Sequence, residues 1–273
     1  MPVFSVVSEL CHADGICARV CPANVIKGHA GQVPEMRPDT EAQCIACGHC
    51  MAFCPHGAAR VDVLPLEEAL PLDKKQMPDA DAVEMLFRSR RSIRQFAKEP
   101  VSRERLEHIL AAVRHAPSAK NRRPVHWLMV YERDTLKRIG DCMADWLEAA
   151  AAKGGASIGM PEAEGLARAW RRGLDPFFRG APHLLLAVTP DDWAWSAVDA
   201  AIILTYVELA ALPHGVGACW AGYVTAAVKQ HAPLRELLGL ADNENVSGGQ
   251  MLGLIALRPT TSAPRSPLPV RWL

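Results

Sequence analysis

From residue 81 onward, the apolar positions follow helical spacing in some segments and strand spacing in others. Leu106, Ile109, Leu110 and Val113 lie at i, i+3, i+4 and i+7, which predicts a helix that Ser102 can cap. Three apolar runs, 125–131, 183–188 and 251–257, predict β-strands. Residues 193–212 predict a helix that is apolar on most faces, which requires burial at the domain centre or against a second subunit. The pattern predicts an α+β domain with a mixed sheet and surrounding helices.

The stretch before this domain has a different character. Residues 63–82 contain three prolines and several charges without clear periodicity, which is typical of a linker. We therefore expect three segments, namely a small domain at 1–62, a linker at 63–82 and the α+β domain at 83–273.

Seven of the nine cysteines lie between residues 11 and 54, in two groups related by a shift of 33 residues. The second group and the proline after it have the C-x2-C-x2-C-x3-C-P spacing of bacterial ferredoxins, which bind 4Fe–4S clusters. The shift places Cys11 on Cys44, Asp14 on Cys47, Cys17 on Cys50, Cys21 on Cys54 and Pro22 on Pro55. The small domain is thus an internal duplication in which aspartate replaces one cysteine.

The spacing predicts two clusters with exchanged fourth cysteines, because the cysteine before the proline ligates the other cluster. Cluster one would take Cys11, Cys17 and Cys54, with Asp14 as a fourth ligand. Cluster two, a 4Fe–4S cluster, would take Cys44, Cys47, Cys50 and Cys21. Asp14 has a second interpretation as a turn residue before Gly15, which would leave cluster one as 3Fe–4S rather than 4Fe–4S. A zinc site or buried free cysteines are the alternatives to iron.

Composition narrows the class of protein. The chain of 273 residues has 30 Lys plus Arg and 30 Asp plus Glu, so no gross charge indicates a nucleic-acid or membrane partner. The sequence begins without a basic segment and long apolar run, so we expect no signal peptide. The longest apolar run, 200–212, contains Glu208 and is too short to span a bilayer. We expect a cytoplasmic protein, where clustered thiols indicate metal rather than disulfides.

Four motifs between residues 83 and 273 resemble the nitroreductase family of FMN flavoproteins: RRSIRQF at 90–96, APSAKNRRPVHW at 116–127, GVGACWAG at 215–222 and PRSPLPVRW at 264–272. The first motif suits a phosphate, because arginines give bidentate, charge-assisted hydrogen bonds to phosphate oxygens. The alternative is a solvated basic face. The resemblance implies that the FMN phosphate is bound by Arg90, Arg91, Ser92, Arg94 and Arg265.

The second and third motifs correspond to family residues around the flavin ring. The resemblance implies ring contacts from Pro117, Ser118, Ala119 and Asn121, usually given by the other subunit, and from Cys219, Trp220, Ala221 and Gly222. An asparagine amide suits the flavin pyrimidine edge because it offers both a donor and an acceptor. Cys219 is expected to pack as a small buried residue rather than to act as a nucleophile. Arg122 and Arg123 stand before Pro124 where the family often has glutamine.

Together the motifs resemble ferredoxin-fused nitroreductases. The resemblance implies a homodimeric, FMN-dependent oxidoreductase that receives electrons through its clusters, with a ferredoxin or reductase as donor. The acceptor would be a small nitroaromatic or quinone, with activated C=C or C–halogen bonds as rivals. No residue is assigned as catalytic. The alternative is a non-catalytic electron-transfer module with FMN as a relay, and an open cavity over the flavin would distinguish the two.

Overall fold

The computed structural model describes residues 3–152 and 160–273 and divides into two compact units. The amino-terminal unit is Met1–Met77 together with Ala119–Arg122, and the carboxy-terminal unit is Pro78–Ser118 with Arg123–Leu273. The division at Met77 lies inside the segment expected to be a linker, which carries short 3-10 turns at Leu66–Glu68 and Lys74–Gln76 before a helix begins at Ala80. The grouping of Ala119–Arg122 with the first unit was not expected from the sequence.

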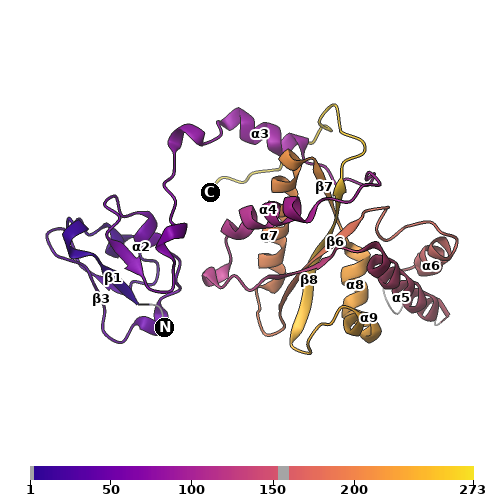
Figure 1. Ribbon diagram of the computed structural model, residues 1–273, viewed down its shortest axis with the longest axis horizontal. Helices are drawn as coiled ribbons and strands as arrows, with labels where there is room; N and C mark the ends of the chain where they lie inside the picture. The colour runs from indigo at the N-terminus through magenta and orange to yellow at the C-terminus, as the bar shows by residue number, and fades with distance from the viewer. Residues whose placement is uncertain (1–2, 153–159) are drawn as a thin grey trace. The chain divides into compact units, whose positions relative to one another are not determined.

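The amino-terminal unit has two antiparallel strand pairs and two short helices (Figure 1). Its elements are β1 (Phe4–Val6), α1 (Ile16–Arg19), β2 (Ile26–Lys27), β3 (Glu35–Met36), α2 (His49–Ala52) and β4 (Ala59–Val61). β1 pairs with β4 and β2 pairs with β3. Phe4, Val25, Ile26 and Val61 form a small core with the buried Cys17 and Cys50.

The internal duplication is visible in the backbone. A shift of 33 residues carries α1 onto α2, and it carries the 3-10 turn Ser8–Leu10 onto the 3-10 turn Glu41–Gln43. The glycines before the two helices, Gly15 and Gly48, have left-handed φ angles of 70° and 73°. Each half therefore wraps its cysteines in the same turn, and glycine allows that turn at no steric cost.

The carboxy-terminal unit is built on a four-stranded sheet in the order β5 (His126–Val130), β6 (His183–Pro190), β8 (Glu244–Leu254) and β7 (Val216–Trp220). All three pairings are antiparallel. The α+β class is confirmed, but these strands form an antiparallel rather than a mixed sheet. The third predicted strand, 251–257, begins earlier and ends earlier than expected, and β7 was not predicted as a strand.

Helices cover both faces of this sheet (Figure 1). α4 (Arg103–Ala112) and α7 (Ser196–Ala211) pack on the face that carries Leu185 and Ala187. The opposite face, with Leu184 and Leu186, packs against α5 (Arg133–Ala152), α6 (Ala163–Arg171), α8 (Gly222–Gln230) and α9 (Ala232–Leu237). The alternation follows from the two-residue period of a strand.

α3 (Ala80–Ser89) precedes these elements in the chain. Ser102 caps α4 as predicted, because its Oγ accepts a hydrogen bond from Arg105 N.

α7 lies where the apolar segment 193–212 predicted a helix, but one side of it is exposed. Val198 and Tyr206 are exposed, whereas Leu204 and Val207 are fully buried. With the following 3-10 turn, the segment Ser196–His214 is long and apolar enough by length and composition to cross a membrane, which corrects the expectation that it was too short. Its contacts with β6, β7 and β8 are those of a helix in a folded α+β core.

Candidate functional site

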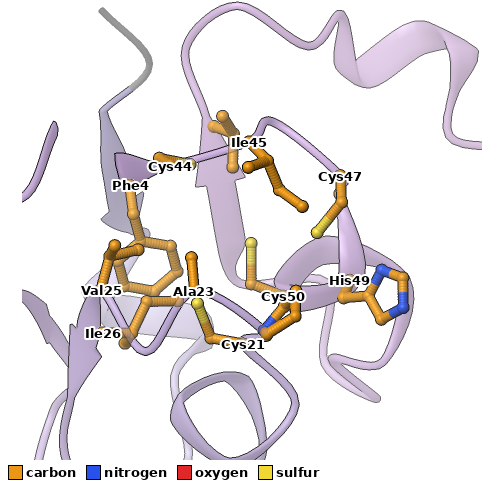
Figure 2. Close-up of a pocket in the computed structure, with 13 residues that line it drawn as sticks. Phe4, Cys21, Ala23, Val25, Ile26, Cys44, Ile45, Cys47, His49 and Cys50 are labelled. Atoms are coloured by element: carbon orange, nitrogen blue, oxygen red, sulfur yellow. The ribbon is translucent and has the colours of Figure 1, made fainter. Parts of the chain in front are cut away.

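Four cysteines from both halves of the duplication surround one cavity of the amino-terminal unit. Cys44, Cys47 and Cys50 line it together with Cys21, and its walls include Phe4, Ile26 and Val61. Figure 2 shows the sulfur atoms of Cys21, Cys47 and Cys50 turned toward the same space. The set expected for cluster two, including the cysteine contributed by the other half, is therefore brought together in an apolar setting.

The complementary set lines a second cavity. Cys11, Asp14, Cys17 and Cys54 are found there with His12 and His56, whose rings stack with centroids 3.7 Å apart. Asp14 Oδ1 accepts a hydrogen bond from Ile16 N at 2.9 Å, and Oδ2 lies 3.9 Å from His56 Nε2. Asp14 thus serves the turn before α1 with one oxygen and faces the cavity that the three cysteines line.

Burial and backbone donors set the electrostatics of these thiols. Burial raises the pKa of Cys50 to about 12, so a thiolate there needs a cationic partner such as iron. Burial also raises the pKa of Cys17. Burial acts in the same direction on Cys54, but backbone N–H donors, including Ala58 N at 3.2 Å from the sulfur, outweigh it and lower the pKa of that thiol.

The arrangement does not suit a single metal ion. Across residues 3–152 and 160–273, no group of three or more His, Cys, Asp or Glu side chains is placed to hold one ion. Zinc would need four ligands at about 2.0–2.3 Å from one centre. An iron–sulfur cluster is a larger body held by cysteine thiolates, and each of the two cavities is lined by four candidate ligands, four cysteines in one and three cysteines with Asp14 in the other.

In the carboxy-terminal unit, the first and third family motifs lie side by side. Ile93 N donates to Ala218 O at 2.9 Å, and Phe96 bridges Ile255 beyond the end of β8. Gly217 makes this close approach feasible, because a Cβ at that position would lie 2.6 Å from Ile93 Cγ1. Arg94 is therefore held next to Cys219.

These two motifs open onto a cavity of about 400 Å³. Arg94, Cys219, Trp220 and Gly222 line it, and a Cβ at Gly222 would meet only open space. A ligand can therefore approach the backbone at Gly222, where α8 begins and its N–H groups and dipole favour negative charge. Burial raises the pKa of the Cys219 thiol, in agreement with a packing role, although Arg94 and Arg179 act in the opposite direction.

The other residues expected around FMN are placed as follows. Arg90 ends α3, and its Nη1 donates to Glu208 Oε1 at 2.8 Å, a partly buried ion pair with α7. Arg91 and Ser92 follow in the loop before Ile93, and Ala221 is buried directly before α8. Arg265 lies in the exposed tail after β8, which has no regular secondary structure.

The second family motif divides between the two units. Pro117 and Ser118 belong to the carboxy-terminal unit, and Ser118 Oγ accepts from Arg123 N at 2.9 Å. Ala119 and Asn121 group with the amino-terminal unit, where Asn121 Nδ2 donates to the carbonyl oxygens of Ile45 (3.1 Å) and Ala46 (3.0 Å). Asn121 thus contacts the loop between Cys44 and Cys47, and its expected role at the flavin stays a prediction.

The sequence analysis did not identify two charged residues of the carboxy-terminal unit as functional candidates. Glu208 carries no motif, and its partner Arg90 is 118 residues away in the chain. Arg179 lines the 400 Å³ cavity from the loop between α6 and β6. The only sequence signal near Arg179 is the DPFFRG stretch, whose aspartate and glycine are typical turn residues.

Comparisons with known proteins agree with these two units. Residues 87–254 match the nitroreductase family, and residues 4–27 match the 4Fe-4S binding domain. A protein of Archaeoglobus fulgidus that carries the name NADH dehydrogenase/NAD(P)H nitroreductase is 29% identical over 165 residues, covering 60% of this chain and 79% of the relative.

Solved structures show the same fold in the carboxy-terminal unit. A nitroreductase with bound FMN from Bacteroides fragilis superimposes with a TM-score of 0.56 at 20% identity, covering 69% of this chain and 98% of that one. A nitroreductase with bound FMN from Desulfitobacterium hafniense gives a TM-score of 0.55 at 22% identity, covering 69% and 96%. The chain therefore belongs to the nitroreductase family of oxidoreductases and carries an amino-terminal 4Fe-4S binding domain.

Proposed function

We propose that the protein is an FMN-dependent oxidoreductase that receives electrons through two iron–sulfur clusters and reduces a small organic acceptor, a nitroaromatic or a quinone. FMN, when bound, supplies the chemistry that joins one-electron transfer from clusters to two-electron reduction of an acceptor. The protein supplies the binding sites, the orientation of the acceptor and the exclusion of water. A ferredoxin or a reductase is the proposed electron donor.

This proposal rests on one cavity of the carboxy-terminal unit, which is lined by Arg94, Cys219, Trp220 and Gly222. Its volume of about 400 Å³ is within the range of small-molecule sites, and residues of two family motifs meet in it. The resemblance assigns these four residues to FMN, so the cavity supports a flavin site, and the choice of an enzyme over a relay rests on the family of oxidoreductases to which the chain belongs. FMN-bound relatives of the same fold support the choice of cofactor.

The two cysteine cavities support the two-cluster part of the proposal. Cys21 joins the second group and Cys54 joins the first, as the ferredoxin spacing requires. The purified protein should be brown-yellow, with flavin and iron–sulfur absorbance, whereas a colourless preparation would contradict both cofactor assignments.

We expect the variant with Arg90→Ala and Arg94→Ala to lose FMN while its iron content stays that of the wild type. Removing two guanidinium groups removes charge-assisted hydrogen bonds to the phosphate, whereas the clusters depend on the other unit. The measurement is flavin and iron per chain after gel filtration. Because Arg90 also pairs with Glu208, the variant with Arg91→Ala and Arg94→Ala serves as a second test. Full flavin occupancy in both variants would show that the phosphate is bound elsewhere.

We also propose a homodimer, and we expect a solution mass of twice the 29.7 kDa chain. Four apolar side chains are exposed and would be buried by a second subunit, namely Val198 and Tyr206 on α7 and Val270 and Trp272 of the tail. Tyr206→Lys should therefore shift the protein toward monomer and lower its FMN content. Leu174→Lys, at an exposed loop leucine, is the control. Light scattering after gel filtration gives the mass, and a wild-type monomer that keeps its FMN would overturn the proposal.

A further inference from the structure

Arg179 is the second arginine of the cavity that Arg94 lines. Asp175 holds the turn that presents it: Oδ1 accepts from Phe178 N at 2.7 Å and Oδ2 accepts from Gly180 N at 2.8 Å. Arg179 N also donates to Asp175 O, and Arg179 has a left-handed φ of 56°. A non-glycine residue in that region is uncommon and requires support from its surroundings. The turn therefore fixes the backbone from which this guanidinium extends.

The charged side chains that line the cavity are unequal in number. Its lining holds two guanidinium groups, Arg94 and Arg179, and one carboxylate, Glu162. The Tyr223 hydroxyl donates to Glu162 Oε1 at 3.4 Å, so this carboxylate has a neutral partner within the lining. Arg94, Arg179 and Glu208 all act electrostatically on Cys219, where the two arginines lower the pKa of the thiol and Glu208 raises it.

The remaining walls suit an aromatic ring. The cavity lining includes Phe177, Trp220, Tyr223 and Met251, and Trp220 is 42% exposed. Aromatic side chains and methionine provide apolar, polarizable surfaces for a planar ligand. The family resemblance assigns Arg94 to FMN, which leaves Arg179 as the cation available to a second ligand.

We propose that Arg179 binds an anionic group of the acceptor, so that the enzyme acts on aromatic acceptors that bear a carboxylate or a comparable anion. This inference rests on the proposed function, since it names the substrate class of the same cavity. A guanidinium recognises a carboxylate through two parallel N–H···O bonds, which gives both affinity and orientation. An anion anchored at Arg179 would hold the ring between the aromatic walls.

Ligand binding tests the inference without turnover. Calorimetric titration of the FMN-loaded protein with benzoate and with benzamide compares an anionic and a neutral ring of similar size. We expect the wild type to bind benzoate about tenfold more tightly or better, the effect of one charged hydrogen-bonding pair. Arg179→Gln should bring the ratio of the two affinities near one, and Arg179→Lys should give an intermediate ratio, because lysine keeps the charge but loses the bidentate geometry.

Arg172→Gln is the matched control, since Arg172 is an exposed arginine of the same loop region outside the cavity lining. It should keep the wild-type ratio. The inference is overturned if the wild type shows no preference for benzoate, if Arg179→Gln keeps that preference, or if Arg179→Gln loses FMN, which would assign Arg179 to the flavin. Failure of the proposed function gives a different result, namely a wild type that binds benzoate but reduces neither 4-nitrobenzoate nor benzoquinone.

Discussion

Replacing Arg90 with alanine is expected to lower the free energy of unfolding of the carboxy-terminal unit by about 3–5 kcal/mol, the cost of breaking a buried ion pair from one side. Glu208 is 5% exposed on α7, and Arg90 Nη1 lies 2.8 Å from its carboxylate. Without the guanidinium, the carboxylate stays in the core without its cation. Arg90 is partly exposed, with 27% of its side-chain surface accessible, so we expect the lower end of the range.

Tryptophan fluorescence can follow this unit alone in the full chain. All seven tryptophans lie between Trp127 and Trp272, within the carboxy-terminal unit. We would compare the free energies of unfolding in denaturant of three variants: Arg90→Ala, Arg91→Ala, and the double variant Arg90→Ala with Glu208→Gln. Arg91 lacks an ion pair among the residues that the structure describes, so its variant should stay within about 0.5 kcal/mol of the wild type. The second substitution should recover part of the loss, because a neutral amide costs less to bury.

An equal loss in Arg90→Ala and Arg91→Ala would contradict this role for Glu208. The ion pair with Glu208 also gives Arg90 a structural role besides its proposed role in phosphate binding. Arg90 bridges the end of α3 and the last turn of α7, so it ties the first family motif to the helix that packs on the sheet. Loss of FMN from an Arg90 variant alone would therefore not separate a missing ligand from a loosened fold.

Predictions from the sequence were most accurate for features that depend on residues close together in the chain. The 33-residue register predicted which cysteines meet, because each half folds as one local turn with glycine before its helix. The cap at Ser102 and the strands around Leu128 and Leu186 were predicted for the same reason, since each depends on a few neighbouring residues.

Long-range pairing was not predictable in this way. The contact of Glu208 with Arg90 depends on the packing of α7, which no local pattern specifies. β7 was missed because its small residues, Gly217 and Ala218, lack the β-branched character of a typical strand. Gly217 is small because a Cβ there would lie 2.6 Å from Ile93 Cγ1. The bonds from Asn121 to Ile45 and Ala46 have no sequence signal, since an asparagine between a lysine and an arginine looks like an ordinary loop residue.

Asp14 combines a turn role with a place in the cavity where cluster one is proposed. Its Oδ1 accepts from Ile16 N two residues later, which is the geometry of an aspartate turn. Its Oδ2 is not used in that hydrogen bond, and Asp14 lines the cavity with Cys11, Cys17 and Cys54. One carboxylate can therefore serve both roles, so the test must change the ligand without breaking the turn.

Asp14→Asn and Asp14→Cys separate the two roles. Asparagine keeps an oxygen for Ile16 N but offers iron no anionic ligand, whereas cysteine restores the ligand found at Cys47 in the second half. If Asp14 holds iron, mild oxidation should remove one iron from cluster one of the wild type and more readily from Asp14→Asn. Asp14→Cys should keep four irons in each cluster and lower the potential of cluster one, because thiolate stabilises the oxidised cluster more than carboxylate does.

Iron counting and electron paramagnetic resonance before and after oxidation give both readings on the same sample. The 3Fe–4S signal should grow in the order Asp14→Cys, wild type, Asp14→Asn, while the signal of cluster two, expected at Cys21, Cys44, Cys47 and Cys50, stays constant in all three. That constancy is the internal control, since no substitution touches the second cavity. Two equally stable four-iron clusters in the wild type and in Asp14→Asn would show that the carboxylate only shapes the turn before α1 and that cluster one takes its fourth ligand from elsewhere.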